Sequence, residues 1–231
     1  MWIFPLAAAL ISALFSGIVL FQYSVRRHPA HLAWAAALFI FAVASACDFL
    51  GSISGWTPFI SKVYYLCGAT VVVGFLGLGT LYLPAPRRVA RAWLAVMLVI
   101  TAVSAIMLAR AGMDRTALAA GAEPGWKAIQ KPAILTVLAI AVSSIGTLIL
   151  VGGAIYSAVF RRLPLANILI AAGTLIVAGG SSLSNLGRYE LQSIGQAAGI
   201  VVMFAGFLLT MSGVKKAAAA RAAAEPAATE A

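Results

Sequence analysis

The sequence predicts an all-α, polytopic integral membrane protein with seven transmembrane helices, and three observations lead to this fold class. Of the 231 residues, 63% are apolar and only 10% are charged, whereas soluble domains have about 45–50% apolar and about 25% charged residues. The mean hydropathy is +1.03. Apolar stretches recur at the length of about 20 residues that one helical crossing needs. Soluble enzymes, disulfide-stapled secreted modules and disordered regulators are therefore excluded.

Seven apolar stretches form the predicted transmembrane domain, residues 1–213. Proline, glycine and paired arginines separate most of them, because proline and glycine end helices and arginine resists the hydrocarbon. The weakest boundary is the turn at residues 184–190. Residues 214–231 are expected to form an Ala-rich cytoplasmic tail that begins as a fraying helix end. The predicted spans are 3–24, 32–52, 60–82, 90–109, 133–158, 164–184 and 191–213.

The basic residues predict a multi-pass protein of a bacterial plasma (inner) membrane, with the N-terminus outside and the C-terminus inside. Short cytoplasmic loops are enriched in Lys and Arg, and no basic residue precedes the first span, which also argues against a cleaved signal peptide. The outer segments carry six basic residues, four of them in one longer loop. In this orientation the inner segments carry Arg26, Arg27, Arg87, Arg88, Arg91, Arg161, Arg162, Lys215, Lys216 and Arg221.

The net charge of +10 points to the lipid bilayer as partner, with anionic lipid at the cytoplasmic face. Nucleic acid is not expected as a partner, because the cations gather at span ends. The tryptophans support the same span ends without using charge, since indole rings prefer the headgroup level. Trp2, Trp56 and Trp126 are expected at the outer interface, and Trp34 and Trp93 at the inner one.

The first three and the last three spans resemble each other, which predicts a 3+1+3 arrangement of two parallel repeats. Arg26-Arg27 after the first span corresponds to Arg161-Arg162 after the fifth. Gly68 and Gly74 in the third span correspond to Gly199 and Gly206 in the seventh. Parallel repeats occur in transporters whose substrate site lies between the halves. Chance similarity among Leu-, Ala- and Gly-rich helices is the alternative.

Polar side chains crowd the outer halves of the predicted spans, and the inner halves hold far fewer. Polar and ionisable groups inside a membrane are costly and often functional. The functional interpretation is an outward-facing pocket for a zwitterionic or small polar ligand, roofed by the loop at 110–132. The candidate ligand-binding residues are Asp48, Lys62, Tyr65, Ser181, Asn185, Arg188, Glu190, Gln192 and Gln196.

A structural interpretation of the same residues stays open. Asp48 with Lys62, and Arg188 with Glu190, would then form interfacial ion pairs, while the hydroxyls and amides bind neighbouring helices. Cys47 and Cys67 fall at similar predicted depth. They are either a disulfide or, as we expect, two buried thiols that act as small apolar residues.

Catalysis and cofactor binding are not predicted. A retinal-binding rhodopsin needs a lysine in its last span, and residues 191–213 contain none. The two histidines, His28 and His31, lie together in one loop, whereas bis-histidine haem needs histidines on neighbouring helices. The common metal, nucleotide and hydrolase motifs do not occur. We therefore expect no enzyme activity, no metal and no cofactor.

A run in the third predicted span resembles a known family. Residues 61–69 (SKVYYLCGA) follow a short outer loop with Trp56 and Pro58. This stretch is similar to the seven-helix sensor modules at the N-terminus of some bacterial histidine kinases, over about residues 1–85. The chain departs from those receptors because it carries no kinase domain. The resemblance implies a receptor-like ligand-binding bundle that signals through a separate partner protein.

Three functions are therefore considered. The first is a stand-alone sensor or ligand-binding module. The second is a small-molecule transporter or transporter subunit, which needs a polar path past the membrane midplane. The third is an accessory subunit of a larger membrane complex, which needs a lipid-facing stripe of small residues, and Gly195 and Gly199 have the GxxxG spacing for it.

Overall fold

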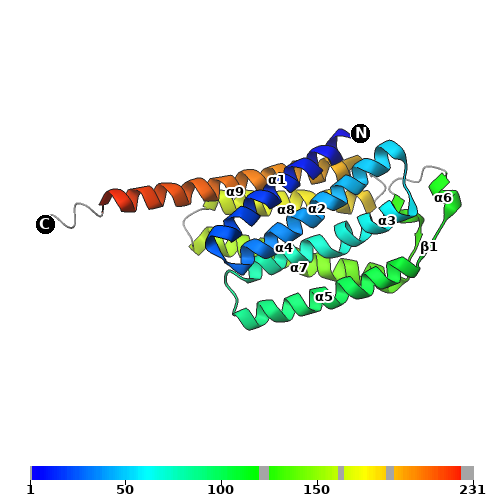
Figure 1. Ribbon diagram of the computed structural model, residues 1–231, viewed down its shortest axis with the longest axis horizontal. Helices are drawn as coiled ribbons and strands as arrows, with labels where there is room; N and C mark the ends of the chain where they lie inside the picture. Colours follow the sequence, from blue (N-terminus) through cyan, green and yellow to red (C-terminus); the bar gives the residue numbers. More distant parts are fainter. Residues whose placement is uncertain (1, 120–124, 161–163, 186–189, 225–231) are drawn as a thin grey trace.

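The computed structural model describes residues 2–119, 125–160, 164–185 and 190–224, and the chain there is almost entirely helical (Figure 1). The third predicted span is built from three consecutive segments, α3 (Pro58–Tyr64), the π-helical η1 (Tyr65–Val71) and α4 (Val72–Leu81). The other long helices are α1 (Ile3–Arg26), α2 (Pro29–Ser54), α5 (Arg87–Arg110), α7 (Ala133–Phe160), α8 (Pro164–Asn185) and α9 (Glu190–Ala224).

The helices confirm a multi-pass, all-α membrane protein. Within the described residues, six helical segments are long and apolar enough to cross a membrane, and α8 contributes a shorter apolar stretch, Leu165–Ser181. Large apolar side chains face outward, such as Leu98 and Val99 on α5 and Leu148 on α7. In water such a surface would be unfavourable, but lipid tails solvate it. Helices occur at all seven predicted stretches.

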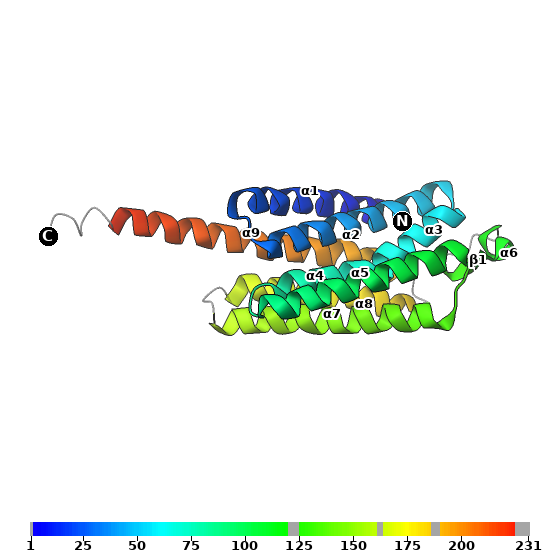
Figure 2. The ribbon, with the colours of Figure 1, turned by 60° about the horizontal axis from the view of Figure 1, so that its bottom comes forward.

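The helix α9 continues past the predicted last span. That span ends at residue 213, whereas α9 runs to Ala224 and extends well beyond the other helices (Figure 2). Alanine has the highest helix propensity of all residues, so the Ala-rich segment continues the helix after the apolar pattern has ended. Residues 225–231 of the predicted tail lie outside the described residues.

Local signals explain where α2 and α3 begin. His28 accepts a hydrogen bond from the Ala30 N–H (3.3 Å), and Thr57 accepts one from the Ile60 N–H (3.3 Å). Each capping residue is followed by a proline in the first turn, where the missing N–H costs nothing. The positive φ of Arg27 (52°) ends α1 and turns the chain sharply into α2.

The connection between α5 and α7 contributes a compact unit, here called the cap segment, which consists of residues 111–119 and 125–132. Its strands β1 (Gly112–Met113) and β2 (Ile129–Gln130) pair antiparallel. Between them lie α6 (Arg115–Ala119) and the 3₁₀ turn η2 (Gly125–Ala128). We call this end of the bundle the cap end. The opposite end, where α1 meets α2 and α4 meets α5, is the arginine end (Figure 1).

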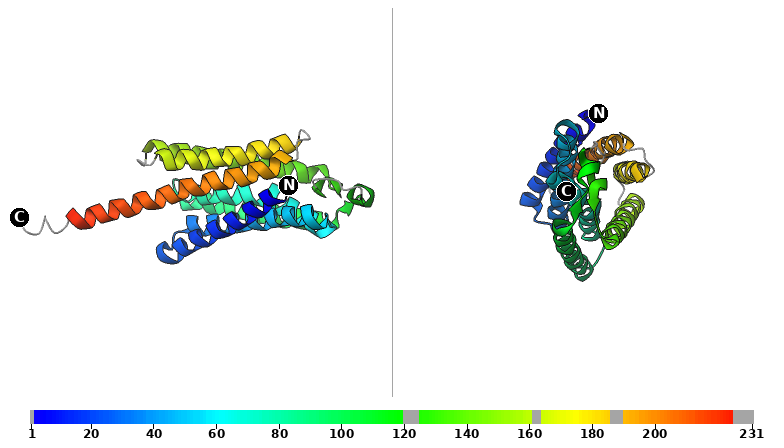
Figure 3. Two further views of the ribbon diagram at one scale, coloured as in Figure 1. Left: turned by 90° about the horizontal axis from the view of Figure 1, so that it is seen from above. Right: turned by 90° about the vertical axis from the view of Figure 1, so that its right-hand side faces the viewer.

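Six of the helices form a closed ring. Going around it, α1 packs on α2, α2 on α4, α4 on α7, α7 on α8, α8 on α9, and α9 returns to α1. The end-on view in Figure 3 shows this order, with α5 outside the ring beside α4. The main hydrophobic core, which includes Phe15, Leu38, Leu150 and Met203, lies inside the ring.

Glycines let neighbouring helices approach closely. A Cβ at Gly77 of α4 would lie 3.2 Å from the Gly146 backbone of α7, and one at Gly195 of α9 would lie 3.0 Å from Gly180 of α8. A Cβ at Gly199 would lie 2.6 Å from a backbone oxygen of α8. The glycines with GxxxG spacing on α9 therefore pack inside the bundle rather than forming a stripe that faces lipid.

Two tryptophans connect other helices to α4. The indole N–H groups donate to backbone carbonyls of α4, Trp34 to Leu76 (3.2 Å) and Trp93 to Gly74 (3.1 Å). Their expected place at the inner headgroup level stays a prediction.

Candidate functional site

A cluster of polar side chains lies between α2, α3 and α9 near the cap end. Its carboxylate is Asp48 of α2, which is only 8% exposed. The Ser193 hydroxyl of α9 donates to Asp48 Oδ2 at 2.9 Å. Since these residues are 145 positions apart in the chain, the bond ties the second helix of the protein directly to the last.

A second bond runs parallel to the first. Tyr64, at the end of α3, is 4% exposed, and Gln192 Nε2 donates to its hydroxyl at 2.7 Å. Gln196, one turn further along α9, lies beside the same hydroxyl. The Gln196 side chain is 7% exposed, and its Oε1 has no hydrogen-bond partner. We call Asp48, Tyr64, Gln192, Ser193 and Gln196 the polar cluster.

The polar cluster brings together donors and acceptors of several kinds. It has one carboxylate, two hydroxyls and two amides, and the carboxylate can bind an ammonium group by a charge-assisted hydrogen bond. A buried acceptor without a partner, such as Gln196 Oε1, costs free energy that a ligand or water with a donor would recover. These are groups of the kind that bind small polar molecules, and here four of the five side chains are paired with each other.

Trp56 connects the polar cluster to the cap segment. Its indole ring lies 2.5 Å from the positions that a Cβ would take at Gly51 of α2 and at Gly125 of η2. Only glycine fits on either side of this ring. The ring also makes an edge-on contact with Tyr64, with 5.3 Å between ring centroids. The cap segment is thus held against the tyrosine of the polar cluster.

The cap segment makes a second contact with the bundle. Tyr65 packs against Trp126 with ring centroids 6.2 Å apart. Lys131 Nζ lies 5.0 Å from the Tyr65 ring centroid and 4.8 Å from that of Trp126, which is a cation–π geometry. Partial burial lowers the pKa of Lys131 below its ordinary value. The cap segment therefore docks on two aromatic residues, Trp56 just before α3 and Tyr65 just after it.

The structure brings some of the predicted site residues together and separates others. Asp48, Gln192 and Gln196 meet in the polar cluster. Tyr65 instead belongs to the contact with Trp126, and Lys62 Nζ donates to the Ala109 carbonyl at the end of α5 (3.2 Å). Ser181 donates to the Val177 carbonyl of its own helix (3.1 Å). The side chains of Asn185, Arg188 and Glu190 lie outside the described residues.

The sequence reasoning missed Tyr64 and Ser193 as site residues. Ser193 follows Gln192 directly, so the polar face of α9 was a usable signal. Tyr64 carries no such signal, because Tyr64 and Tyr65 are adjacent aromatic residues and both are buried. Which of the two faces α9 depends on the helical register, and the π-helical segment that begins at Tyr65 changes that register.

In the described part of the chain, the structure shows the state of the two cysteines and where side chains that bind metals lie. Cys47 and Cys67 are both free, with Cys47 buried, so the expected apolar thiols occur and the disulfide does not. Among the described residues, no group of three or more His, Cys, Asp or Glu side chains is placed to hold a metal ion.

Comparison of this chain with protein-family models, with curated proteins and with solved structures finds no match. The site must therefore be interpreted from its own geometry.

Proposed function

We propose that this chain is a stand-alone, receptor-like ligand-binding module of a bacterial plasma membrane, with seven crossings. In this proposal the cap end faces outside and the arginine end faces the cytoplasm. Arg26, Arg27, Arg87 and Arg88 all lie at the arginine end, which supports that orientation through the positive-inside rule. The seventh crossing is α8, whose helix runs from Pro164 to Asn185.

The observation that carries the proposal is the pair of hydrogen bonds from α9 to Asp48 and Tyr64. Polar side chains inside a membrane bundle are costly unless they bind each other or a ligand. A polar ligand in this place would take over some of these bonds and so change how α9 packs on α2 and α3. In this proposal the polar cluster is the ligand site without its ligand, and its side chains bind each other.

The proposed output is the far end of α9. This helix begins at the polar cluster and extends past the ring to Ala224 (Figure 3). A displacement at Gln192 and Ser193 would therefore reach the arginine end through one continuous helix. There a separate signalling protein would receive it, as the resemblance to histidine-kinase sensor modules implies. The π-helical η1, directly after Tyr64, adds support because π-helical turns are frequent at functional sites.

The proposed ligand is a small molecule that carries an ammonium group and a second polar group. Asp48 would bind the ammonium, and the amides of Gln192 and Gln196 would bind the second group. Entry from outside would require the cap segment to move away from Trp56. A zwitterion such as an amino acid has these features.

The ring order also favours the two-repeat interpretation. The last helix of each three-helix unit packs on the first helix of the other, α4 on α7 and α9 on α1. Two parallel repeats related by a two-fold axis would produce this closure.

The transporter and accessory-subunit alternatives have less support. A transporter needs a polar path past the midplane, and the polar side chains of the cluster stay near the cap end. An accessory subunit needs a lipid-facing stripe of small residues, and Gly195 and Gly199 pack against α8.

The test is a thermal-unfolding screen of the purified protein with the twenty amino acids. A ligand at 100 times its Kd stabilises by about 2.7 kcal/mol, which corresponds to about 5–10 °C in Tm for a chain of this size. We expect at least one compound to raise Tm by this amount. Asp48→Asn should abolish the shift while the protein still expresses and folds.

The matched control is Asp114→Asn in the cap segment. Asp114 caps α6, asparagine caps helices equally well, and the carboxylate lies outside the polar cluster. This variant should keep the full ligand-induced shift. An equal shift in Asp48→Asn would remove Asp48 from the site, and no shift with any compound would count against a zwitterion site.

A further inference from the structure

The π-helical segment η1 gives the third span one residue more than a regular helix of the same extent would hold. The Val72 N–H donates to the Cys67 carbonyl, five residues earlier, whereas an α-helix pairs residues four apart. Each residue of an α-helix turns the chain by about 100° and advances it by about 1.5 Å. The extra residue therefore decides which side chains of α3 face each neighbouring helix.

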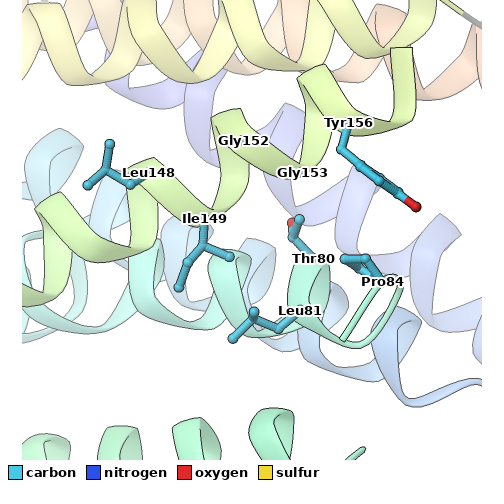
Figure 4. Close-up of a pocket in the computed structure, with 8 residues that line it drawn as sticks. All are labelled: Thr80, Leu81, Pro84, Leu148, Ile149, Gly152, Gly153 and Tyr156. Carbon is cyan, nitrogen blue, oxygen red and sulfur yellow. The ribbon is translucent and has the colours of Figure 1, made fainter. Parts of the chain in front are cut away.

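The helix α4, which follows η1, is held tightly by its neighbours. On one side Thr80 lies against Gly153 of α7, where a Cβ would clash with Thr80 Cγ2 (Figure 4), and a groove of about 280 Å³ remains beside this contact. On another side a Cβ at Gly79 would clash with the ring of Trp34. These contacts leave α4 little room to rotate, so a change in the register of the third span must move α3.

An α-helical η1 would move each residue of α3 into the position of the residue before it. Tyr65 would then take the place of Tyr64 and face α9. In the same shift Lys62 would take the place of Ser61, which is 0% exposed. Burying a lysine ammonium group is costly unless it is paired. Both registers present a tyrosine to α9, and they differ in which tyrosine it is.

Two polar side chains favour the π-helical register. The Ser143 hydroxyl of α7 donates to the Ala69 carbonyl inside η1 at 2.9 Å, and a side chain inserted into the hydrogen-bond ladder is one cause of helix distortion. Conversion of η1 to an α-helix would move this carbonyl, since Ala69 is one of the seven π-helical residues. Lys62 Nζ donates to the Ala109 carbonyl at 3.2 Å, a bond that the other register would break.

We propose that Ser143 and Lys62 are positioning residues, which hold η1 in the π-helical register and so select Tyr64 rather than Tyr65 for the polar cluster. This inference deepens the proposed function, on which it rests for its consequence, because the register decides which tyrosine lies at the ligand site. The register itself can be measured without a ligand.

The test places p-azidophenylalanine, a photo-crosslinking residue close to tyrosine in size, at position 64 or at position 65 of the full chain in lipid nanodiscs. Tyr64 lies at Gln192 of α9, and the Tyr65 hydroxyl lies beside Thr136 of α7. Without other changes, we expect peptide mapping to find adducts of position 64 on α9 and adducts of position 65 on α7.

The informative variant is Lys62→Ala combined with Ser143→Ala, which removes both restraints on the register. Adducts of position 65 on α9 should then rise at least fivefold, because position 65 takes the place of position 64. Each single variant should change the pattern in the same direction by a smaller amount.

Two controls separate a change of register from general loosening of the bundle. Ser144→Ala removes an exposed hydroxyl next to Ser143 and should leave both adduct patterns unchanged. Deletion of Leu66 removes the extra residue, so that a regular α-helix keeps α3 and α4 where they lie. In that background the double variant should leave the adducts of position 64 on α9.

Two outcomes would overturn the proposal. Adducts of position 65 that stay on α7 in the double variant would show that Ser143 and Lys62 do not hold the register. An equal gain of α9 adducts from position 65 in the deletion background would show that the double variant loosens the bundle. A ligand screen without a hit would leave either result unchanged, so this proposal and the proposed function fail separately.

Discussion

The two ends of the bundle are held together in different ways. At the cap end, side chains of helices far apart in sequence bind each other, as Ser193 binds Asp48 and Gln192 binds Tyr64. At the arginine end, Trp34 and Thr80 bind the backbone of α4, and two cavities remain. Lipid tails are as apolar as the helices, so hydrophobicity gives little attraction between helices in a membrane. Direct polar bonds join the helices at one end, and cavities remain between the helices at the other.

Replacing one glycine by alanine at each end should give the largest difference in the free energy of unfolding between the two ends. Gly51→Ala places a methyl group 2.5 Å from the Trp56 ring, which Gly125 confines on its other side. We expect the free energy of unfolding to fall by about 1–3 kcal/mol, the usual cost of overpacking. Gly152→Ala meets open space and should change stability by less than about 1 kcal/mol.

The measurement is thermal unfolding in one detergent, with all variants at equal protein concentration. It compares the loss of stability in the two glycine variants. Equal losses in Gly51→Ala and Gly152→Ala would mean that the two ends are packed alike, and the comparison would be wrong.

A double-mutant cycle should sharpen the comparison by measuring the polar bond itself. Tyr64→Phe and Gln192→Leu each remove one partner of the 2.7 Å hydrogen bond. Hydrogen bonds between membrane helices have coupling energies of about 0.6 kcal/mol, with a maximum near about 1.7 kcal/mol. We expect a coupling within that range from the unfolding free energies of the four proteins.

The control cycle pairs Tyr64→Phe with Trp34→Phe, which lies at the other end of the bundle. Distant sites are additive to within about 0.5 kcal/mol, so this cycle should show no coupling beyond that. Coupling of equal size in both cycles would indicate a general loosening of the bundle rather than one broken bond.

The smallest effect is expected from the pH dependence of one group, Asp114 of the cap segment. The Thr116 hydroxyl and the N–H groups of Thr116 and Ala117 donate to Asp114. They lower the pKa of Asp114 below its ordinary value of 3.8, and the Thr116 side chain contributes most. A lowered carboxyl pKa means that this stabilisation is present above the ordinary pKa and is lost as pH falls through the lowered one.

Carbon-13 NMR of the Asp114 carboxyl group measures the midpoint directly. It should lie below 3.8, and Thr116→Val should move it upward. Acid should loosen α6. A midpoint that Thr116→Val leaves unchanged would mean that the hydroxyl does not cap α6 in solution.

Much of the fold was predictable because its determinants are local. Runs of about 20 apolar residues mark helices that cross a bilayer, and Pro29 and Pro58 mark where two of them begin. Part of the candidate site was predictable for the same reason, since Asp48, Gln192 and Gln196 stand out as polar residues in apolar spans. The end of α9 was not, because apolar pattern and helix propensity separate after residue 213.

The sequence by itself determined that this chain is helical, apolar and multi-pass, because hydropathy and helix-ending residues act over a few turns. Only the tertiary structure decided that Tyr64 rather than Tyr65 faces α9, that Lys62 binds Ala109, and that a mostly apolar cavity lies inside the ring. These features depend on the order of helices around the ring and on close approaches at single glycines. The bonds from α9 to Tyr64 and Asp48 join residues more than a hundred positions apart, and the pattern of one helix does not encode its neighbour.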